Sequence, residues 1–341
     1  MLTIAYIGNG KSTNRYHIPF AKQLKDIHIK TIYDPFPSPW EPLEGVTYTD
    51  NIYEVRNDPD IQLVILSIPP SAHYAVAKQC LEAGKNTLVE KPFTETAAEA
   101  KELFDLAKQR GVFLQAYQNR RFDTDFLTVQ KVINSGVLGD ILEVEMHFDY
   151  FRPEIPESVE QYSLNTSYLY GHACHTVDQV ISYFGKPNKV HYDVRQLLGE
   201  GRMNDYFDLD FYYPNSLKVS IKSSYFRIKE RPSFVVYGKK GMFVKAVKDR
   251  QEEDLKRFYM PTNTDFGMDR PEDYGTLTYI DDQGGYHDEK VISEKGSYAQ
   301  MYQAIYDSIC LGKPKLVKDD ETITQIEILE EGICQMKEQN H

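Results

Sequence analysis

A glycine turn near the start of the chain constrains the fold more than any other feature. The apolar run from Thr3 to Ile7 stops at Gly8-Asn9-Gly10, and apolar residues then recur at helical spacing. This order of strand, glycine turn and helix predicts a dinucleotide-binding unit. Gly8 permits the tight turn, and Gly10 lets the backbone approach a pyrophosphate held at the helix N-terminus.

The helix after the turn begins with side chains that can bind phosphate. Thr13 stands where the usual fingerprint has a third glycine. Its hydroxyl and that of Ser12 can donate hydrogen bonds to phosphate oxygens. We therefore expect the cofactor to contact Gly8, Asn9, Gly10, Ser12 and Thr13.

The second predicted strand, from Ile29 to Tyr33, ends at Asp34. A carboxylate at this point of a dinucleotide-binding unit hydrogen-bonds a ribose 2′-hydroxyl. It also repels a 2′-phosphate, and no arginine follows it, so NAD is favoured over NADP, which stays possible. The alternative is that Asp34 only forms a turn, because Asp-Pro commonly starts one.

The third predicted strand, Ile61 to Ser67, leaves into Ile68-Pro69-Pro70. Ligands of an open α/β sheet lie outside the carboxyl ends of its strands. We therefore expect Ser67, Ile68 and Pro69 to lie against the cofactor. His73 follows on the first turn of a helix, where it either faces the cofactor or satisfies the helix start.

The fourth predicted strand, Asn86 to Val89, delivers Glu90-Lys91-Pro92 to the same edge of the sheet. A lysine between apolar walls and a positively charged ligand loses affinity for its proton and can act as acid or base. We predict that Lys91 is catalytic and that Glu90 and Lys91 contact the cofactor. The alternative is a solvated lysine that happens to follow a strand.

A change of pattern after a fifth strand, Phe113 to Ala116, predicts two domains. Residues 1–118 form an α/β Rossmann domain, with Asn119 just beyond it as a further cofactor contact. Residues 119–341 contain alternating polar and apolar runs between helices. They predict an α+β domain with a large, mostly antiparallel open sheet and helices on one side. Its Tyr- and Phe-rich strands leave one face to be covered, for which a partner subunit is suited.

The densest group of chemical side chains in the second half runs from Tyr168 to Asp178. His172 and His175 share a face on a regular helix, as do His175 and Asp178. Three interpretations stay open: a metal site, a structural helix start with Asp178 tethering a neighbour, or His175 as an acid/base opposite the nicotinamide. We expect no metal, because no fourth ligand suggests itself.

Composition excludes several classes of function. Lys and Arg number 39 against 51 Asp and Glu, so the formal net charge is −12, which disfavours nucleic acid and anionic membranes. The sequence has no apolar run long enough to cross a bilayer. The four cysteines are far apart, which suits reduced thiols, and the first residues do not resemble a signal peptide. We expect a cytoplasmic protein.

With these motifs in view, the sequence resembles the glucose–fructose oxidoreductase/inositol dehydrogenase (Gfo/Idh/MocA) family. The resemblance is carried by Glu90-Lys91-Pro92, by Pro69-x-x-x-His73, by the Gln118–Phe122 stretch and by His175. It implies a Rossmann domain and an α/β domain whose open sheet mediates formation of a homodimer or homotetramer. It also implies nicotinamide-dependent oxidation or reduction of a sugar, inositol or related polyol.

The family pattern makes Lys91 the catalytic lysine, with a cis bond to Pro92, and His175 the histidine of a D-x-x-x-H motif. Gly171 stands where that motif has its aspartate. The alternative function is therefore a non-catalytic NAD(P)-binding sensor, which Gly171 favours and which Lys91 with His175 opposes. If the protein is an enzyme, substrate hydroxyls would be held by Arg120, Tyr150, Tyr168 and His172.

Overall fold

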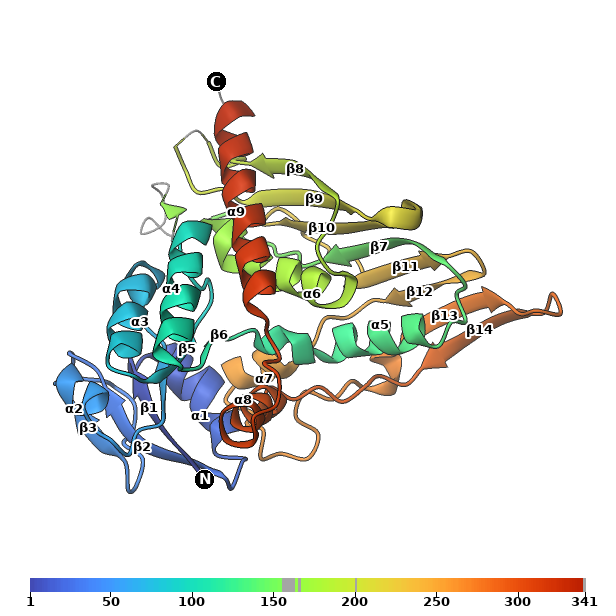
Figure 1. Ribbon diagram of the computed structural model, residues 1–341. Helices are drawn as coiled ribbons and strands as arrows, with labels where there is room; N and C mark the ends of the chain where they lie inside the picture. Colours follow the sequence, from blue (N-terminus) through green and yellow to red (C-terminus); the bar gives the residue numbers. More distant parts are fainter. Residues whose placement is uncertain (155–162, 165–166, 200, 340–341) are drawn as a thin grey trace. The chain divides into compact units, whose positions relative to one another are not determined.

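The computed structural model describes residues 1–154, 163–164, 167–199 and 201–339 (Figure 1). Contacts divide the chain into two compact units. The first consists of Met1–Asn119, Glu252–Phe266 and Tyr298–Ile326, and the second of Arg120–Gln251, Gly267–Ser297 and Glu327–His341.

The first unit is built on a six-stranded parallel sheet with the order β3-β2-β1-β4-β5-β6. This is the strand order of a dinucleotide-binding Rossmann fold, and the predicted fold class is confirmed. Its strands are β1 (Leu2–Ile7), β2 (Ile27–Tyr33), β3 (Thr47–Thr49), β4 (Leu63–Leu66), β5 (Asn86–Val89) and β6 (Leu114–Ala116). The central strands read as continuous apolar runs because helices cover both faces.

Helices α3 and α4 pack against each other beside β5 and β6, whereas α1 contacts α8. The helical elements of this unit include η1 (Thr13–His17), α1 (Ile18–Ala21), α2 (Ile52–Arg56), η2 (Pro70–Ala72), α3 (His73–Glu82), α4 (Ala97–Arg110) and α8 (Ala299–Leu311). Helix α7 (Gln251–Lys256) begins at the boundary between the units. Helix α4 starts with a capping box, in which Thr96 and Glu99 bond each other's backbone N–H groups. It ends at Gly111 in the left-handed conformation.

The second unit contains an eight-stranded sheet with the order β14-β13-β12-β11-β7-β10-β9-β8. Among its described strands only β7 and β10 pair in parallel, so the predicted, mostly antiparallel sheet is confirmed. The strands are β7 (Ile141–His147), β8 (Lys189–Arg195), β9 (Tyr206–Tyr212), β10 (Lys218–Ser224), β11 (Phe234–Gly238), β12 (Gly241–Lys245), β13 (Gly275–Ile280) and β14 (Tyr286–Val291).

Helices α5 (Thr124–Asn134) and α6 (Cys174–Phe184) lie along one face of this sheet (Figure 1). Their apolar side chains share one core with the strands and with the last turns of α9 (Asp319–Gln339). The strand aromatics Phe207, Phe211 and Phe243 are buried in that core. Alternate positions of the strands carry charges instead, and Lys222 pairs with Asp208 at 2.8 Å. No described helix is long and apolar enough to cross a membrane.

Candidate active site

The glycine turn and the end of β4 approach each other closely. Gly8 has a φ of +107°, and a Cβ added to it would lie 2.2 Å from the carbonyl oxygen of Ser67 and 3.2 Å from Ile68 Cγ2. Only glycine fits this backbone. Strands β1 and β4 are neighbours at the point where the strand order reverses, which is where open α/β sheets bind ligands. The predicted contacts Gly8, Ser67 and Ile68 therefore lie together at the carboxyl ends of β1 and β4.

Asp34 holds the glycine turn through its carboxylate. Its Oδ2 accepts a hydrogen bond of 2.8 Å from Asn9 N–H, and its Oδ1 accepts one of 2.9 Å from Phe36 N–H. The carboxylate therefore stabilises both the glycine turn and the turn at Phe36. This agrees with the alternative interpretation, in which Asp34 forms a turn. Each oxygen has a second lone pair, so a ribose hydroxyl can still be accepted.

The hydroxyls of Ser12 and Thr13 already have acceptors within the protein. Thr13 Oγ1 donates to Gly8 O at 2.6 Å, and Ser12 Oγ donates to Glu90 Oε1 at 2.9 Å. Each hydroxyl has one proton, so in this arrangement that proton is used within the protein. Thr13 is buried, and its inward bond explains how the turn tolerates a residue larger than the usual glycine.

Backbone N–H groups remain the natural donors to a diphosphate here. Helical structure begins at Lys11, directly after the turn, and the first N–H groups of a helix have no acceptor within it. A Cβ at Gly10 would have no heavy atom within 4 Å, so no protein atom blocks the approach of a diphosphate to the Gly10 backbone. The close-packed Gly8, the open Gly10 and the helix start fit a bound dinucleotide.

The His73 side chain connects the loop that follows β4 to the loop that follows β5. Its ring is fully buried, with Nδ1 2.8 Å from Pro92 O and Nε2 3.0 Å from Ile68 O. Burial lowers the pKa of His73, although the two carbonyls partly oppose that effect. The ring therefore supports the loops of Ile68 and Pro92, a role that differs from both of those predicted for it, namely facing the cofactor and satisfying the helix start. Pro69 directly precedes η2, between these two loops.

Glu90 and Lys91 form a tightly held turn after β5. The Lys91–Pro92 peptide bond is cis, as the resemblance implies. Glu90 Oε2 accepts a hydrogen bond of 2.8 Å from Lys91 N–H, while Oε1 lies 2.9 Å from both Ser12 Oγ and His17 Nε2. Burial raises the pKa of Glu90, but His17 and Lys91 outweigh burial and lower it to about 2. Glu90 is therefore ionised at neutral pH.

In the second unit, His172 lies among aromatic rings. Its ring centroid is 4.4 Å from that of Tyr168, 5.3 Å from Tyr150 and 5.9 Å from Tyr225. Tyr168 is 1% exposed, and its hydroxyl bonds Ser223 Oγ. We call Tyr150, Tyr168, His172 and Tyr225 the His172 cluster. Tyr168 is a buried member of it, whereas Tyr150 is only partly buried.

Two cations beside Tyr150 were missed by the sequence analysis. The Arg152 guanidinium lies 4.5 Å from the Tyr150 ring centroid, and Lys248 Nζ lies 4.9 Å from it. Lys248 is 98 positions from Tyr150, so no local pattern connects them. Both add hydrogen-bond donors to the edge of the His172 cluster.

Two further polar residues from the sequence analysis, Arg120 and Asp178, have structural partners. Arg120 is 9% exposed, lies 3.3 Å from Asp123 and stacks over Phe148. Asp178 accepts two hydrogen bonds from Arg121, of 2.8 and 2.7 Å, so it tethers a neighbouring segment. Asn119 opens the short helix η3 (Asn119–Phe122) and is partly buried.

A π-helical segment, η6 (Leu169–Ala173), precedes α6 and contains both Gly171 and His172. The spacing expected for a regular helix therefore does not apply between His172 and His175, which is on α6 and partly exposed. A Cβ at Gly171 would have no heavy atom within 4 Å, so packing does not require glycine there.

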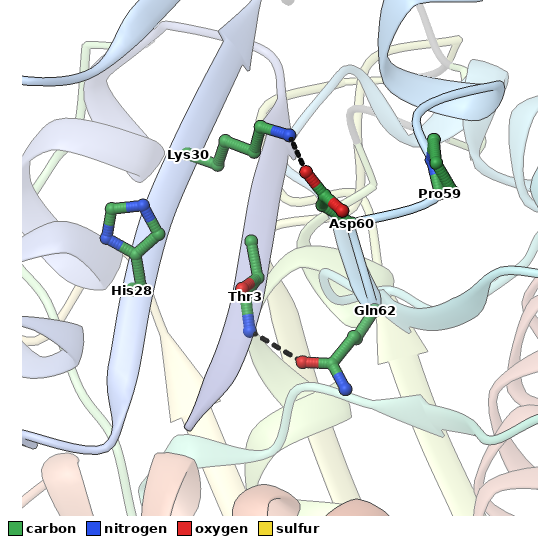
Figure 2. A pocket seen from close by; sticks show the side chains of 6 residues that line it. All are labelled: Thr3, His28, Lys30, Pro59, Asp60 and Gln62. Atoms are coloured by element: carbon green, nitrogen blue, oxygen red, sulfur yellow. Dashed lines mark hydrogen bonds and ion pairs between the residues drawn. The ribbon is translucent and has the colours of Figure 1, made fainter.

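No group of three or more His, Cys, Asp or Glu among the described residues could hold a metal ion. A shallow pocket occurs instead near the amino ends of β1, β2 and β4 (Figure 2). It is lined by Thr3, His28, Lys30, Pro59, Asp60 and Gln62. Lys30 pairs there with Asp58 and Asp60 at 2.8 and 2.7 Å. This pocket lies at the strand ends opposite to Gly8 and Lys91.

Comparison with known proteins matches both halves of the chain to one family. Residues 2–118 match the oxidoreductase family's NAD-binding Rossmann fold, and residues 130–340 match its C-terminal alpha/beta domain. The chain is 43% identical to the uncharacterized oxidoreductase YhhX of Escherichia coli, over 98% of this chain and 97% of that protein. It is 32% identical to the scyllo-inositol 2-dehydrogenase (NADP(+)) IolW of Bacillus subtilis, over 99% and 94%.

Solved structures agree with the sequence relatives. An oxidoreductase from Bacillus cereus superposes with a TM-score of 0.94 at 43% identity, covering 98% of this chain and 96% of that one. The chain therefore belongs to the Gfo/Idh/MocA oxidoreductase family, with an NAD-binding Rossmann domain at its N-terminus.

Proposed function

We propose that this oxidoreductase transfers a hydride between nicotinamide and a CH–OH carbon of a sugar, inositol or related polyol, or the corresponding keto-sugar. The observation that carries the proposal is the hydrogen bond from Ser12 to Glu90, which ties the start of the dinucleotide helix to the Lys91 turn. It holds the backbone turn that carries Lys91 next to the glycine turn. The inositol dehydrogenase among the relatives supports the substrate class.

In this proposal the cofactor supplies the hydride chemistry, and the protein moves the proton. Lys91 takes the proton of the substrate hydroxyl during oxidation and returns it during reduction, helped by His175. Tyr150 and His172 bind substrate hydroxyls, together with the cations Arg152 and Lys248. Arg120 and Tyr168 support this surface through their buried contacts.

Titration of the pure protein with NADH and NADPH, followed by an absorbance screen at 340 nm, tests the function. The panel should contain inositols, sugars and keto-sugars in both directions. Turnover of at least one member is the expected result. Tight cofactor binding without turnover on the whole panel would instead support a sensor. Gly171 is the observation that favours that second candidate, because it removes the aspartate of the D-x-x-x-H pattern without a packing need.

Asp34 should determine the choice between NADH and NADPH. Asp34→Asn keeps the shape but removes the charge that accepts a ribose hydroxyl and repels a 2′-phosphate. A hydrogen bond to a charged group contributes ~1.5–3 kcal/mol. The ratio of the Kd for NADPH to the Kd for NADH should therefore fall by roughly tenfold or more, measured by the fluorescence of the bound reduced cofactor.

Asp105→Asn, at an exposed position on α4, is the matched control and should leave the ratio unchanged. An unchanged ratio in Asp34→Asn, with wild-type thermal stability, would limit Asp34 to its bonds with Asn9 and Phe36.

We also propose that the protein is a cytoplasmic homodimer or homotetramer joined through the eight-stranded sheet. The face opposite α5 and α6 supports this, because it presents Leu142, Tyr212 and Tyr237 as partly exposed apolar side chains among its charges. The four free cysteines suit a reducing compartment. Light scattering after size-exclusion chromatography gives the oligomeric mass, and a monomer at micromolar concentration would contradict the assembly.

A further inference from the structure

An arginine at the edge of the His172 cluster carries a positive charge that no carboxylate of the described residues neutralises. The Arg152 guanidinium lies 4.5 Å from the ring centroid of Tyr150 and 5.7 Å from that of Tyr225. The side chain is exposed, and within residues 1–154, 163–164, 167–199 and 201–339 it forms no ion pair. Its charge is therefore accessible to an anionic ligand at this edge.

The backbone places Arg152 on the same side as Tyr150. Beyond the end of β7, the Tyr150 N–H donates to Ser224 O at 3.0 Å, and the Arg152 N–H donates to Tyr225 O at 2.8 Å. Phe151, between them, forms an isolated bridge to the segment that follows β10. Side chains two positions apart in such an extended segment point to the same side. This alternation explains why the guanidinium returns to the Tyr150 ring.

Contact with two aromatic rings orients the Arg152 side chain. A guanidinium is attracted to the face of an aromatic ring, and the contact restricts a side chain that otherwise has many rotamers. Burial raises the pKa of Tyr225, and the charge of Arg152 opposes that effect, as expected for a cation beside the hydroxyl. A guanidinium that is already oriented loses less freedom when it binds a ligand.

The other two cations around Tyr150 have carboxylate partners. Lys248 Nζ lies 3.1 Å from Glu230 Oε1. Arg231 donates two hydrogen bonds of 2.8 Å to Asp149, whose side chain is 0% exposed. Each of these two pairs is neutral as a whole, so neither supplies a free positive charge to a ligand.

One more carboxylate acts on the cluster, and a cation faces it as well. Asp205 opposes the ionisation of Tyr225. Burial raises the pKa of Asp205, and the charge of Arg202 partly opposes that effect. Among these groups each negative charge thus has a positive one, and Arg152 is left over. In a chain with a formal net charge of −12, this edge of the cluster has a local excess of one positive charge.

A single uncompensated guanidinium suits a carboxylate better than a phosphate ester. Its planar fork donates two parallel hydrogen bonds to the two oxygens of a carboxylate. A phosphate ester carries about two negative charges at neutral pH. The nearest further cation on the Tyr150 ring is Lys248, whose charge is already paired with Glu230.

We propose that the substrate of this oxidoreductase is a polyol with a carboxylate group, such as a sugar acid, and that Arg152, held against Tyr150 and Tyr225, binds that carboxylate. The inference rests on the proposed function and names the substrate class of the same site. The carboxylate is not changed by the reaction. The hydride leaves the CH–OH carbon and the proton leaves its hydroxyl oxygen, as they would in a neutral sugar.

The first test is equilibrium binding to the NADH-loaded protein, in which an alcohol cannot be oxidised. Calorimetry compares glucuronate with glucose, galacturonate with galactose and gluconate with glucitol. In each pair a CH₂OH group replaces the carboxylate. At least one acid should bind roughly tenfold or more tightly than its neutral partner, because it adds a charged hydrogen-bonded pair. Acids that bind no more tightly than their partners would overturn the proposal, and so would glucose 6-phosphate binding more tightly than every acid.

The second test asks whether Arg152 is responsible for the preference. For the acid that binds best, Arg152→Gln should lower the ratio of acid affinity to neutral affinity by ~10–100-fold. Arg152→Lys keeps the charge but not the planar fork, so it should restore only part of the ratio. Arg227→Gln, at an exposed arginine with no ring contact among the described residues, is the matched control and should leave the ratio unchanged. An unchanged ratio in Arg152→Gln, or an equal loss in Arg227→Gln, would overturn the assignment.

Turnover separates this inference from the proposed function. If neutral polyols have values of kcat/KM at least as high as those of the sugar acids, the dehydrogenase stands and the inference is wrong. If a sugar acid binds through Arg152 but nothing in the whole panel is turned over, the anion site stands and the dehydrogenase is contradicted. Both are supported if a sugar acid is turned over and Arg152→Gln raises its KM with a smaller change in kcat.

Discussion

Replacing Lys91 with alanine should leave NADH binding intact and reduce turnover by ~10²–10⁴-fold, the usual contribution of a positioned acid or base. The physical reason is that the alanine protein retains the glycine turn, the helix start and Asp34, which hold the cofactor in our proposal. It lacks the amine that exchanges a proton with the substrate hydroxyl. The measurement is kcat on a substrate identified by the polyol screen, together with Kd for NADH.

Lys108→Ala, at an exposed position on α4, is the matched control for loss of a lysine and should retain full activity. Lys91→Arg adds a second comparison, because it keeps a cation that cannot release its proton near neutral pH. Its turnover should be as low as that of Lys91→Ala. Wild-type kcat in either Lys91 variant would remove the amine from the mechanism.

Gly8→Ala should destabilise the protein, whereas Gly10→Ala should weaken NADH binding without loss of stability. A methyl group at Gly8 would lie 2.2 Å from the Ser67 carbonyl oxygen, in a backbone with a φ of +107°. The strained backbone and the overlap each cost on the order of 1–3 kcal/mol. A methyl group at Gly10 has no protein atom within 4 Å, but it occupies the approach to the pyrophosphate.

Urea unfolding and NADH titration of the two variants together form the experiment, and each glycine controls for the other. A Gly8→Ala protein as stable as the wild type would contradict the close approach of β1 and β4. A Gly10→Ala protein with wild-type Kd for NADH would show that the diphosphate does not pass over this residue.

Local pattern was sufficient for much of the first unit. The apolar runs that end at Gly8, Asp34, Ser67 and Glu90 are strands of one parallel sheet, because buried parallel strands show as short apolar runs with turn residues at their ends. The same reasoning missed β3 and α2. These elements have three and five residues, too few for a period of two or 3.6 to be recognised.

The hydrogen-bond partners of individual side chains could not be predicted from the sequence. Thr13 and Ser12 were reasonable phosphate ligands by type, but their protons go to Gly8 and Glu90. No sequence pattern indicated that the polar ring of His17 is buried and hydrogen-bonded, since its partners Glu90 and Tyr302 are 73 and 285 positions away. Contacts of this length depend on the packing of whole elements, which periodicity does not encode.

Helix α8 belongs to the first unit but lies near the end of the sequence, which has a consequence for how that unit folds. Tyr302 bonds Tyr6, and Tyr298 packs on Phe20 at a ring distance of 5.3 Å, so the last third of the chain covers residues among the first twenty. During synthesis, nearly the whole polypeptide must therefore be made before α8 can cover Tyr6 of β1 and Phe20 of α1. A fragment cut after residue 118 would expose those aromatic rings to water, which makes this half a poor module for transplantation into another protein.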